Sequence, residues 1–221
     1  MTHAETGLIL FIRYPQPGKV KSRLAATLGT RKAAHVYRLC CEIIFSELEG
    51  LPESVEKYLF YSDPEDREQV INWVGNKFLT APQVGGDIGR RMADAFSKVF
   101  QQGAAKSILI GADLPDLSAA VVEEAIAALD ESDIVLGPSH DGGYYLLGMK
   151  RIHEDLFKDI PWGTEQVLER TREKVRNLAL SCSLLPVLRD IDTGEDLRQW
   201  VAEYRSQKHN LLYDFIIRNP L

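Results

Sequence analysis

Basic side chains are concentrated in one short loop near the start of the chain. The residues of this loop that could bind phosphate are Pro15, Gly18, Lys19, Lys21 and Arg23. The loop is expected to lead into a helix, so free backbone N–H groups at the helix start would add to its positive charge. Such a loop suits a phosphate group, although it lacks the G-x-x-x-x-G-K-[ST] spacing of a Walker A loop. A solvated basic turn is the alternative interpretation.

Single carboxylates follow three other apolar segments, and these are Asp113, Asp141 and Asp192. Mg²⁺ is usually held by one or two carboxylates together with phosphate oxygens of a substrate. Asp113 and Asp192 are therefore candidate metal ligands. Each of them alone could instead bond the local backbone at a turn or a helix start. The two together, beside a basic loop, favour a polyphosphate held by Lys, Arg and a divalent cation, Mg²⁺ or Mn²⁺.

Short apolar runs alternate with helical patterns along the chain. The pattern predicts strands over 8–12, 57–61, 77–80, 107–110, 133–136, 144–147 and 180–188. It predicts helices over 22–48 with a break at 29–30, over 87–101, 118–129 and 164–176, and after Asp63 and Thr193. This alternation predicts one three-layer α/β domain over residues 1–221, with a mostly parallel sheet. The connection before 144–147 is too short for a helical crossover, so that strand is expected to be antiparallel or to reach the sheet from outside it.

The loops that carry the basic and acidic residues all follow predicted strands. Open α/β sheets bind ligands outside the carboxyl ends of their strands. We therefore expect the basic loop and the three acidic loops to open on the same edge of the sheet. The last acidic loop leads into a helix whose first residues, Thr193 to Asp196, have the spacing of a capping box.

The composition narrows the class of partner. The chain has 221 residues, and 26 Lys and Arg against 32 Asp and Glu leave a net charge of -6. This balance argues against nucleic acid as a partner. No segment predicts a signal peptide, and no run approaches the ~18 apolar residues of a membrane span. The three cysteines form no metal-ligand pair or disulfide framework and are expected to be buried, so a cytoplasmic protein is predicted.

Six segments, in order, resemble one bacterial family. They lie at 15–24, 83–91, 111–115, 141–148, 161–167 and 190–197, and include P-x-P-G-x-x-K-[ST]-R-L, D-G-G-Y-Y-L-x-G and D-x-D-T-x-E-D-L. The chain resembles the glycosyltransferase-like transferases associated with radical-SAM or selenoproteins, which are in turn similar to 2-phospholactate guanylyltransferase. This resemblance implies the Rossmann-like GT-A fold of nucleotide-diphospho-sugar transferases, with a mixed sheet.

The resemblance also implies roles for particular residues. The first loop would hold phosphates, Asp113 would bind the metal, and Asp192 would bind a second metal or its water. The segment with Gly86, Asp87 and Arg91 would lie near the base and ribose.

Asp113, Asp141 and Asp192 form the predicted catalytic set. The acceptor pocket would be bordered by Gly142, Gly143, Tyr144 and Trp162. Packing of Trp162 on the core is the alternative interpretation for that residue.

Two departures from the family pattern stand out. One acid, Asp113, stands where many metal-dependent glycosyltransferases carry D-x-D, and Gly194 replaces a usual proline.

Three functions follow from these residues. The first is glycosyl transfer from an NDP-sugar to a small-molecule acceptor, in which the metal takes up charge on the leaving diphosphate. The second is nucleotidyl transfer from an NTP to a phosphorylated small molecule with release of pyrophosphate, which the three basic residues of the first loop favour. The third is nucleotide binding without turnover. The sequence leaves the base, the sugar, the acceptor and the oligomeric state open.

Overall fold

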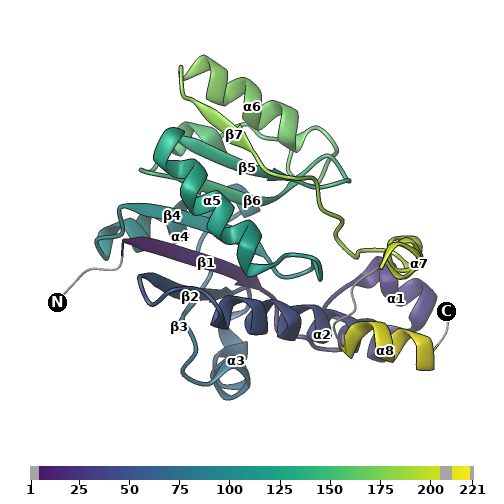
Figure 1. The fold of residues 1–221 in the computed structure, drawn as a ribbon. Coiled ribbons are helices and arrows are strands. Elements are labelled where there is room, and N and C mark those ends of the chain that lie inside the picture. The colour runs from purple at the N-terminus through teal and green to yellow at the C-terminus, as the bar shows by residue number, and fades with distance from the viewer. Residues whose placement is uncertain (1–4, 205–210, 220–221) are drawn as a thin grey trace.

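A seven-stranded sheet forms the centre of the computed structural model, which describes residues 5–204 and 211–219 (Figure 1). The strands are β1 (Thr6–Ile12), β2 (Val55–Tyr61), β3 (Leu79–Pro82), β4 (Lys106–Gly111), β5 (Ile134–Pro138), β6 (Tyr144–Met149) and β7 (Cys182–Leu184). Their order in the sheet is β3-β2-β1-β4-β6-β5-β7. Only β6 runs antiparallel to its neighbours, β4 and β5. The predicted α/β fold with a mixed, mostly parallel sheet is confirmed, as is the antiparallel strand.

Eight α-helices connect or flank these strands in the described residues. They are α1 (Ser22–Leu28), α2 (Thr30–Glu49), α3 (Arg67–Val74), α4 (Ile88–Gln101), α5 (Ala119–Glu131), α6 (Val167–Asn177), α7 (Gly194–Glu203) and α8 (Leu211–Arg218). Short 3₁₀ helices occupy Pro64–Asp66 and Glu154–Phe157. The predicted break between α1 and α2 is confirmed: Gly29 has φ +77°, a conformation that glycine adopts without a Cβ clash.

Both faces of the sheet are covered by helices, which makes the three layers. Leu8, Leu10 and Ile12 of β1 pack in one apolar cluster with side chains of α2, α3 and α5. Ile9 and Phe11 point to the opposite face and pack with side chains of α4 and α6. A strand buried on both faces requires a continuous apolar run, as β1 has.

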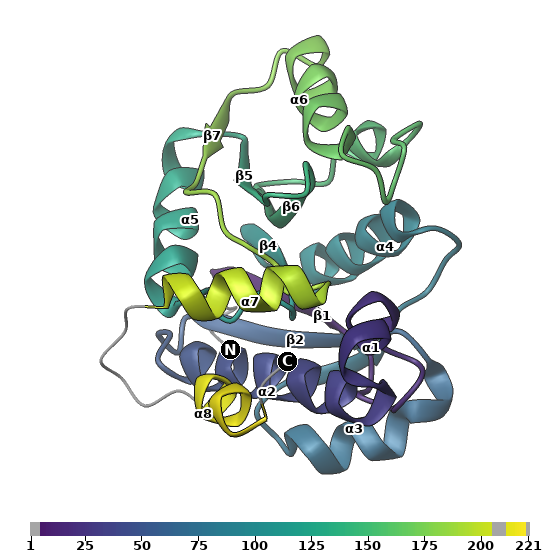
Figure 2. The ribbon, with the colours of Figure 1, turned by 90° about the vertical axis from the view of Figure 1, so that its right-hand side faces the viewer.

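A third apolar cluster holds α7 and α8 against α1 and α2 (Figure 2). Leu24, Trp200 and Leu212 are among its buried members. The indole Nε1 of Trp200 also donates a hydrogen bond to Asp116 Oδ1, 2.9 Å away, in the loop after β4. These contacts hold α7 beside the loop that follows β4.

The length predicted for the last strand is wrong. Of residues 180–188, only Cys182–Leu184 form a strand, followed by an isolated parallel bridge between Ser139 and Leu188. Pro186 has no N–H to donate to a ladder, which explains the interruption.

The expectation for the cysteines holds for two of the three. Cys40 and Cys41 are buried, but Cys182 is exposed because β7 is the edge strand of the sheet. Within residues 5–204 and 211–219, no helix has the length and apolar character needed to cross a membrane.

Candidate active site

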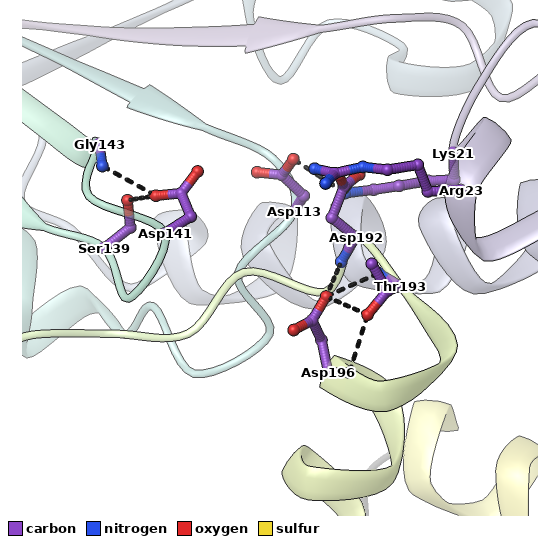
Figure 3. A network of polar contacts seen from close by, with 9 residues as sticks. All are labelled: Lys21, Arg23, Asp113, Ser139, Asp141, Gly143, Asp192, Thr193 and Asp196. Carbon is purple, nitrogen blue, oxygen red and sulfur yellow. Dashed lines mark hydrogen bonds and ion pairs between the residues drawn. The ribbon is translucent and has the colours of Figure 1, made fainter. Parts of the chain in front are cut away.

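Lys21 connects two carboxylates that come from distant parts of the chain. Its Nζ lies 3.0 Å from Asp113 Oδ2 and 3.4 Å from Asp192 Oδ1 (Figure 3). Arg23 forms a second ion pair with the other oxygen of Asp192. The tertiary structure thus brings four of the predicted site residues into one ionic network, which we call the Lys21 network.

The backbone directs Lys21 into the protein. Lys21 has φ 50° and ψ 50° at the position before α1, a left-handed conformation that costs a non-glycine residue about 1–2 kcal/mol. Its side chain is only 6% exposed, and Nζ lies 5.9 Å from the centre of the Tyr37 ring. Burial by itself would lower the pKa of Lys21, but Asp113 and Asp192 outweigh it and raise the pKa above its usual value. Lys21 is therefore a cation at neutral pH.

Asp192 is positioned by the start of α7. The Thr193 hydroxyl accepts a hydrogen bond from Asp196 N at 3.1 Å, and Asp196 Oδ2 accepts one from Thr193 N at 2.7 Å. This confirms the predicted capping box. The same Asp196 oxygen accepts a bond from Asp192 N at 3.2 Å. Burial by itself would raise the pKa of Asp196, but these hydrogen bonds outweigh it and lower the pKa.

Asp113 is positioned by the end of β4. Its main-chain oxygen accepts a hydrogen bond from Ile191 N at 3.0 Å, which ties the loop after β4 to the loop before α7. Its side chain is 38% exposed and that of Asp192 is 28% exposed. Both carboxylates are therefore open to solvent on one side while Lys21 contacts them on the other.

A cation-rich pocket of about 390 Å³ adjoins the network. Its polar lining comes from Arg13, Lys21, Arg23, Ser62, Gln83 and Arg91, beside Asp113 and Asp192. We call it the phosphate pocket, because clustered lysine and arginine suit a polyphosphate. The Gln83 amide is fixed by hydrogen bonds from Nε2 to the carbonyls of Phe60, at 3.0 Å, and Ile12, at 3.4 Å.

A second pocket of about 300 Å³ lies on the other side of Asp113. We call it the acceptor-side pocket, after the prediction from the sequence that residues of this region contact the acceptor. The two pockets share the lining residues Arg23, Ile88, Gly111 and Asp113. Asp113 therefore stands at the junction between them.

Asp141 lies in this second pocket and outside the Lys21 network. Its Oδ1 accepts hydrogen bonds from the Ser139 hydroxyl and from Gly143 N, the latter at 2.9 Å, which closes a tight turn (Figure 3). Gly142, at the centre of this turn, has φ +86°, and a Cβ there would lie 2.2 Å from the carbonyl oxygen of Glu165. A glycine is therefore required at position 142.

Asp190 is a pocket residue that the sequence-based site did not include. It lines the acceptor-side pocket, and burial, Asp141 and Asp113 raise its pKa to about 6. Asp190 lies two residues before Asp192, in a D-x-D pattern after a predicted strand, and this pattern could have indicated it as a site residue. Arg13, Ser62 and Gln83 also line the phosphate pocket without having been predicted for it.

Two aromatic rings form the apolar wall of the acceptor-side pocket. Tyr144 and Trp162 meet edge to face, with ring centres 6.4 Å apart. Trp162 also packs on α4, where a Cβ at Gly89 would lie 2.5 Å from the indole. Trp162 thus lines a pocket and also packs on the core, and its contact with an acceptor stays a prediction.

The remaining predicted residues lie around this centre. Lys19 turns away from the network, pairs with Asp63 at 3.7 Å, and lines a neighbouring pocket of about 330 Å³ that also includes Arg91. Asp87 caps α4 by accepting a hydrogen bond from Arg90 N at 2.8 Å.

Three further predicted residues belong to the loops themselves. The Gly86 carbonyl accepts a hydrogen bond from Arg91 Nε at 3.1 Å. Pro15 and Gly18, which has φ +85°, shape the loop after β1.

The donor set fits a hard divalent cation that also binds phosphate. Asp113 and Asp192 converge on one ammonium group, so both can face one small cation. Among the described residues, no cluster of three His, Cys, Asp or Glu side chains could hold a metal. A cation here would take further ligands from substrate and water, which is the usual coordination of Mg²⁺.

The mixed sheet and the pocket at the carboxyl ends of its strands place the chain in the GT-A-like superfamily. The chain belongs to the family described as uncharacterized protein conserved in bacteria (DUF2064), whose model matches residues 51–164. A search of the curated proteins found no match.

Solved structures support the same class. A candidate nucleotide-diphospho-sugar transferase from Desulfovibrio desulfuricans is 33% identical, with a TM-score of 0.92, and the match covers 98% of this chain and 95% of that one. CMP:2-keto-3-deoxy-manno-octonic acid synthetase complexed with CTP is 12% identical, with a TM-score of 0.57 and coverage of 88% and 96%. The Mycobacterium tuberculosis protein Rv0371c, in complex with manganese, is 15% identical, with a TM-score of 0.51 and coverage of 90% and 98%. At the two lower identities the likeness establishes the fold alone.

Proposed function

We propose that this protein is a divalent-metal-dependent transferase that moves a glycosyl group from an NDP-sugar to a small acceptor. The observation that carries the proposal is the place of Asp113, at the junction of a cation-rich pocket and a second pocket. A diphosphate held in the first pocket would present the group to be transferred to an acceptor held in the second.

The residues of the phosphate pocket would bind and orient the donor. Lys21, Arg23 and Arg91 would contact phosphate oxygens, since all three line the pocket. Asp113 and Asp192 would hold Mg²⁺ or Mn²⁺, which when bound neutralises charge on the leaving diphosphate. Lys21 would then be shared between these carboxylates and the phosphates. The manganese complex of Rv0371c supports a divalent cation in this fold.

The acceptor-side pocket would position the acceptor. Asp141 would receive a hydrogen bond from the attacking group, because both bonds of its turn go to Oδ1 and Oδ2 lies outside that turn. Gly142 and Gly143 would shape this side, and Tyr144 and Trp162 would close the other. A single domain, a cytoplasmic location and the lack of a nucleic-acid partner stay predictions from the sequence.

Nucleotidyl transfer is the second candidate, and one specific observation favours it. Arg13, Lys19 and Arg91 line the neighbouring pocket, which shares Arg13, Ser62 and Arg91 with the phosphate pocket. A triphosphate needs more cationic support than a diphosphate, and these residues could supply it. The link to radical-SAM proteins or to phospholactate also stays a prediction.

Thermal unfolding with Mg²⁺ and a nucleotide panel tests the proposal. We expect UDP-glucose or GDP-mannose to raise Tm, and Asp113→Asn to lose most of this shift. Asp155→Asn, on the exposed surface, is the control with the same change of charge. Product detection by mass spectrometry with acceptor mixtures completes the test. Stabilisation by CTP or GTP alone, with release of pyrophosphate, would establish the second candidate instead.

A further inference from the structure

The acceptor-side pocket has an acidic wall and an aromatic wall. Asp113, Asp141 and Asp190 supply three carboxylates. Tyr144 and Trp162 supply flat apolar surface, and Met92 extends it. A pocket with this division would contact a ligand through hydrogen-bond donors on one side and an apolar face on the other.

The positive charge that lines this pocket is already part of an ion pair. Among the described residues that line it, Arg23 is the one cation, and Arg23 pairs with Asp192. Asp113 is likewise paired, with Lys21, so a phosphate or carboxylate entering the pocket would meet the like charges of Asp141 and Asp190 without an uncommitted basic partner. Like charges in a partly desolvated site strongly disfavour binding. The phosphate pocket, with its several cations, is the opposite case.

The aromatic wall is held in place by packing. Gly89 leaves just enough room for the Trp162 indole against α4, and Tyr144 meets that ring edge to face. A fixed aromatic surface favours a flat or ring-containing ligand, because stacking then requires little ordering of the protein.

We propose that the acceptor is an uncharged or cationic small molecule with a hydroxyl or amine nucleophile and a flat apolar face. The role of this molecule as acceptor rests on the proposed function. In the transfer step, the acceptor hydroxyl oxygen, or the nitrogen of an amine that has already lost its ammonium proton to water, bonds to the anomeric carbon, and the bond from that carbon to the diphosphate oxygen breaks. The diphosphate leaves with the electron pair, and the acceptor proton goes to a carboxylate of the pocket.

Three probes that share a 4-hydroxyphenyl ring test the charge preference. They are tyramine, which is cationic, tyrosol, which is neutral, and 4-hydroxyphenylacetate, which is anionic. Dissociation constants are measured by saturation-transfer NMR titration of the whole chain. We expect tyramine and tyrosol to bind, and 4-hydroxyphenylacetate to bind at least about tenfold more weakly than tyrosol. Trp162→Ala should remove the binding of all probes, which would locate them in this pocket.

Charge variants distinguish the effect of the pocket carboxylates on ligand affinity from the effect of the net charge of the protein. The double variant Asp141→Asn with Asp190→Asn should reduce the ratio of the tyrosol and 4-hydroxyphenylacetate affinities to about threefold or less. Glu53→Gln, an exposed site on another part of the surface, should leave the ratio unchanged.

Three results would overturn the proposal. These are equal binding of the anionic and neutral probes, no binding of any probe, or an unchanged ratio in the double variant. Titration of UDP-glucose and CTP on the same samples keeps the two proposals apart. Absence of nucleotide binding with a retained charge preference would reject the proposed function and leave the pocket chemistry in place.

Discussion

Lys21 Nζ lies 3.0 Å from Asp113 Oδ2, although 92 residues separate the two in the sequence. The loop after β1 and the end of β4 meet because these strands are neighbours in the sheet and run parallel. The contact joins a buried cation to a carboxylate that stands between two pockets. It therefore links the stability of the site to its proposed chemistry.

Removing the Lys21 cation should destabilise the protein. Lys21→Met leaves Asp113 and Asp192 close together without their shared partner, so we expect the free energy of unfolding to fall by roughly 1–3 kcal/mol. Urea unfolding of the purified chain measures this. Lys158→Met removes an exposed cation that pairs with Asp155, and it should change stability far less. Equal effects of the two substitutions would contradict the structural role of Lys21.

Asp196 should act on Asp192 through the backbone. Asp196→Ala removes the capping box and the bond to Asp192 N, so we expect a loss of about 1 kcal/mol of stability. It should also weaken Mg²⁺-dependent nucleotide binding, since Asp192 would lose its fixed position. Calorimetric titration with Mg²⁺ present gives the affinity. Glu195→Ala, in the same turn and outside the capping box, provides the comparison, and an equal loss of affinity there would reject the positioning role.

The effect of a substitution at Gly89 on stability should depend on Trp162. In the wild-type background, Gly89→Ala forces a Cβ against the indole, and we expect a loss of roughly 1–3 kcal/mol. In the Trp162→Ala background the clash is absent, so the same substitution should stabilise α4 by up to about 1 kcal/mol. A double-mutant cycle by urea unfolding measures this change of sign. Additive effects of the two substitutions would show that the packing of the Trp162 indole does not require a glycine at position 89.

Asp133 should make the attachment of β7 pH-dependent. Hydrogen bonds from the Ser181 hydroxyl and amide hold the pKa of Asp133 below its usual value. A lowered carboxyl pKa contributes stability above the unfolded pKa of about 3.9, and this stability is lost as the pH falls through the folded pKa.

Asp133→Asn should therefore reduce stability at pH 7 and have no effect near pH 2. Because Asp133 is only partly buried, the expected difference is below about 1 kcal/mol. Unfolding by urea at pH 7, 4 and 2 follows it, with Glu53→Gln as the charge control. A constant difference across this range would rule out the ionised carboxylate as the cause.

Much of the fold depends on local sequence. The apolar run of β1, the glycine break before α2 and the capping box of α7 were all predicted, because each depends on residues a few positions apart. The short connection before β6 likewise dictated its antiparallel direction. Helix α8 and the short length of β7 were not predicted, since α8 is held by packing on α2 and the pairing of β7 is limited by its position at the sheet edge.

The candidate site likewise combines features that the sequence predicts with features that only the tertiary structure determines. Residue types and their positions after strands were enough to select Asp113, Asp192, Lys21 and Arg23. Only the tertiary structure decided that Lys21 enters the network while Lys19, two residues earlier, pairs with Asp63. The reason is physical: the direction of a long side chain depends on backbone conformation and on charges brought near by other strands, and spacing along a loop specifies neither.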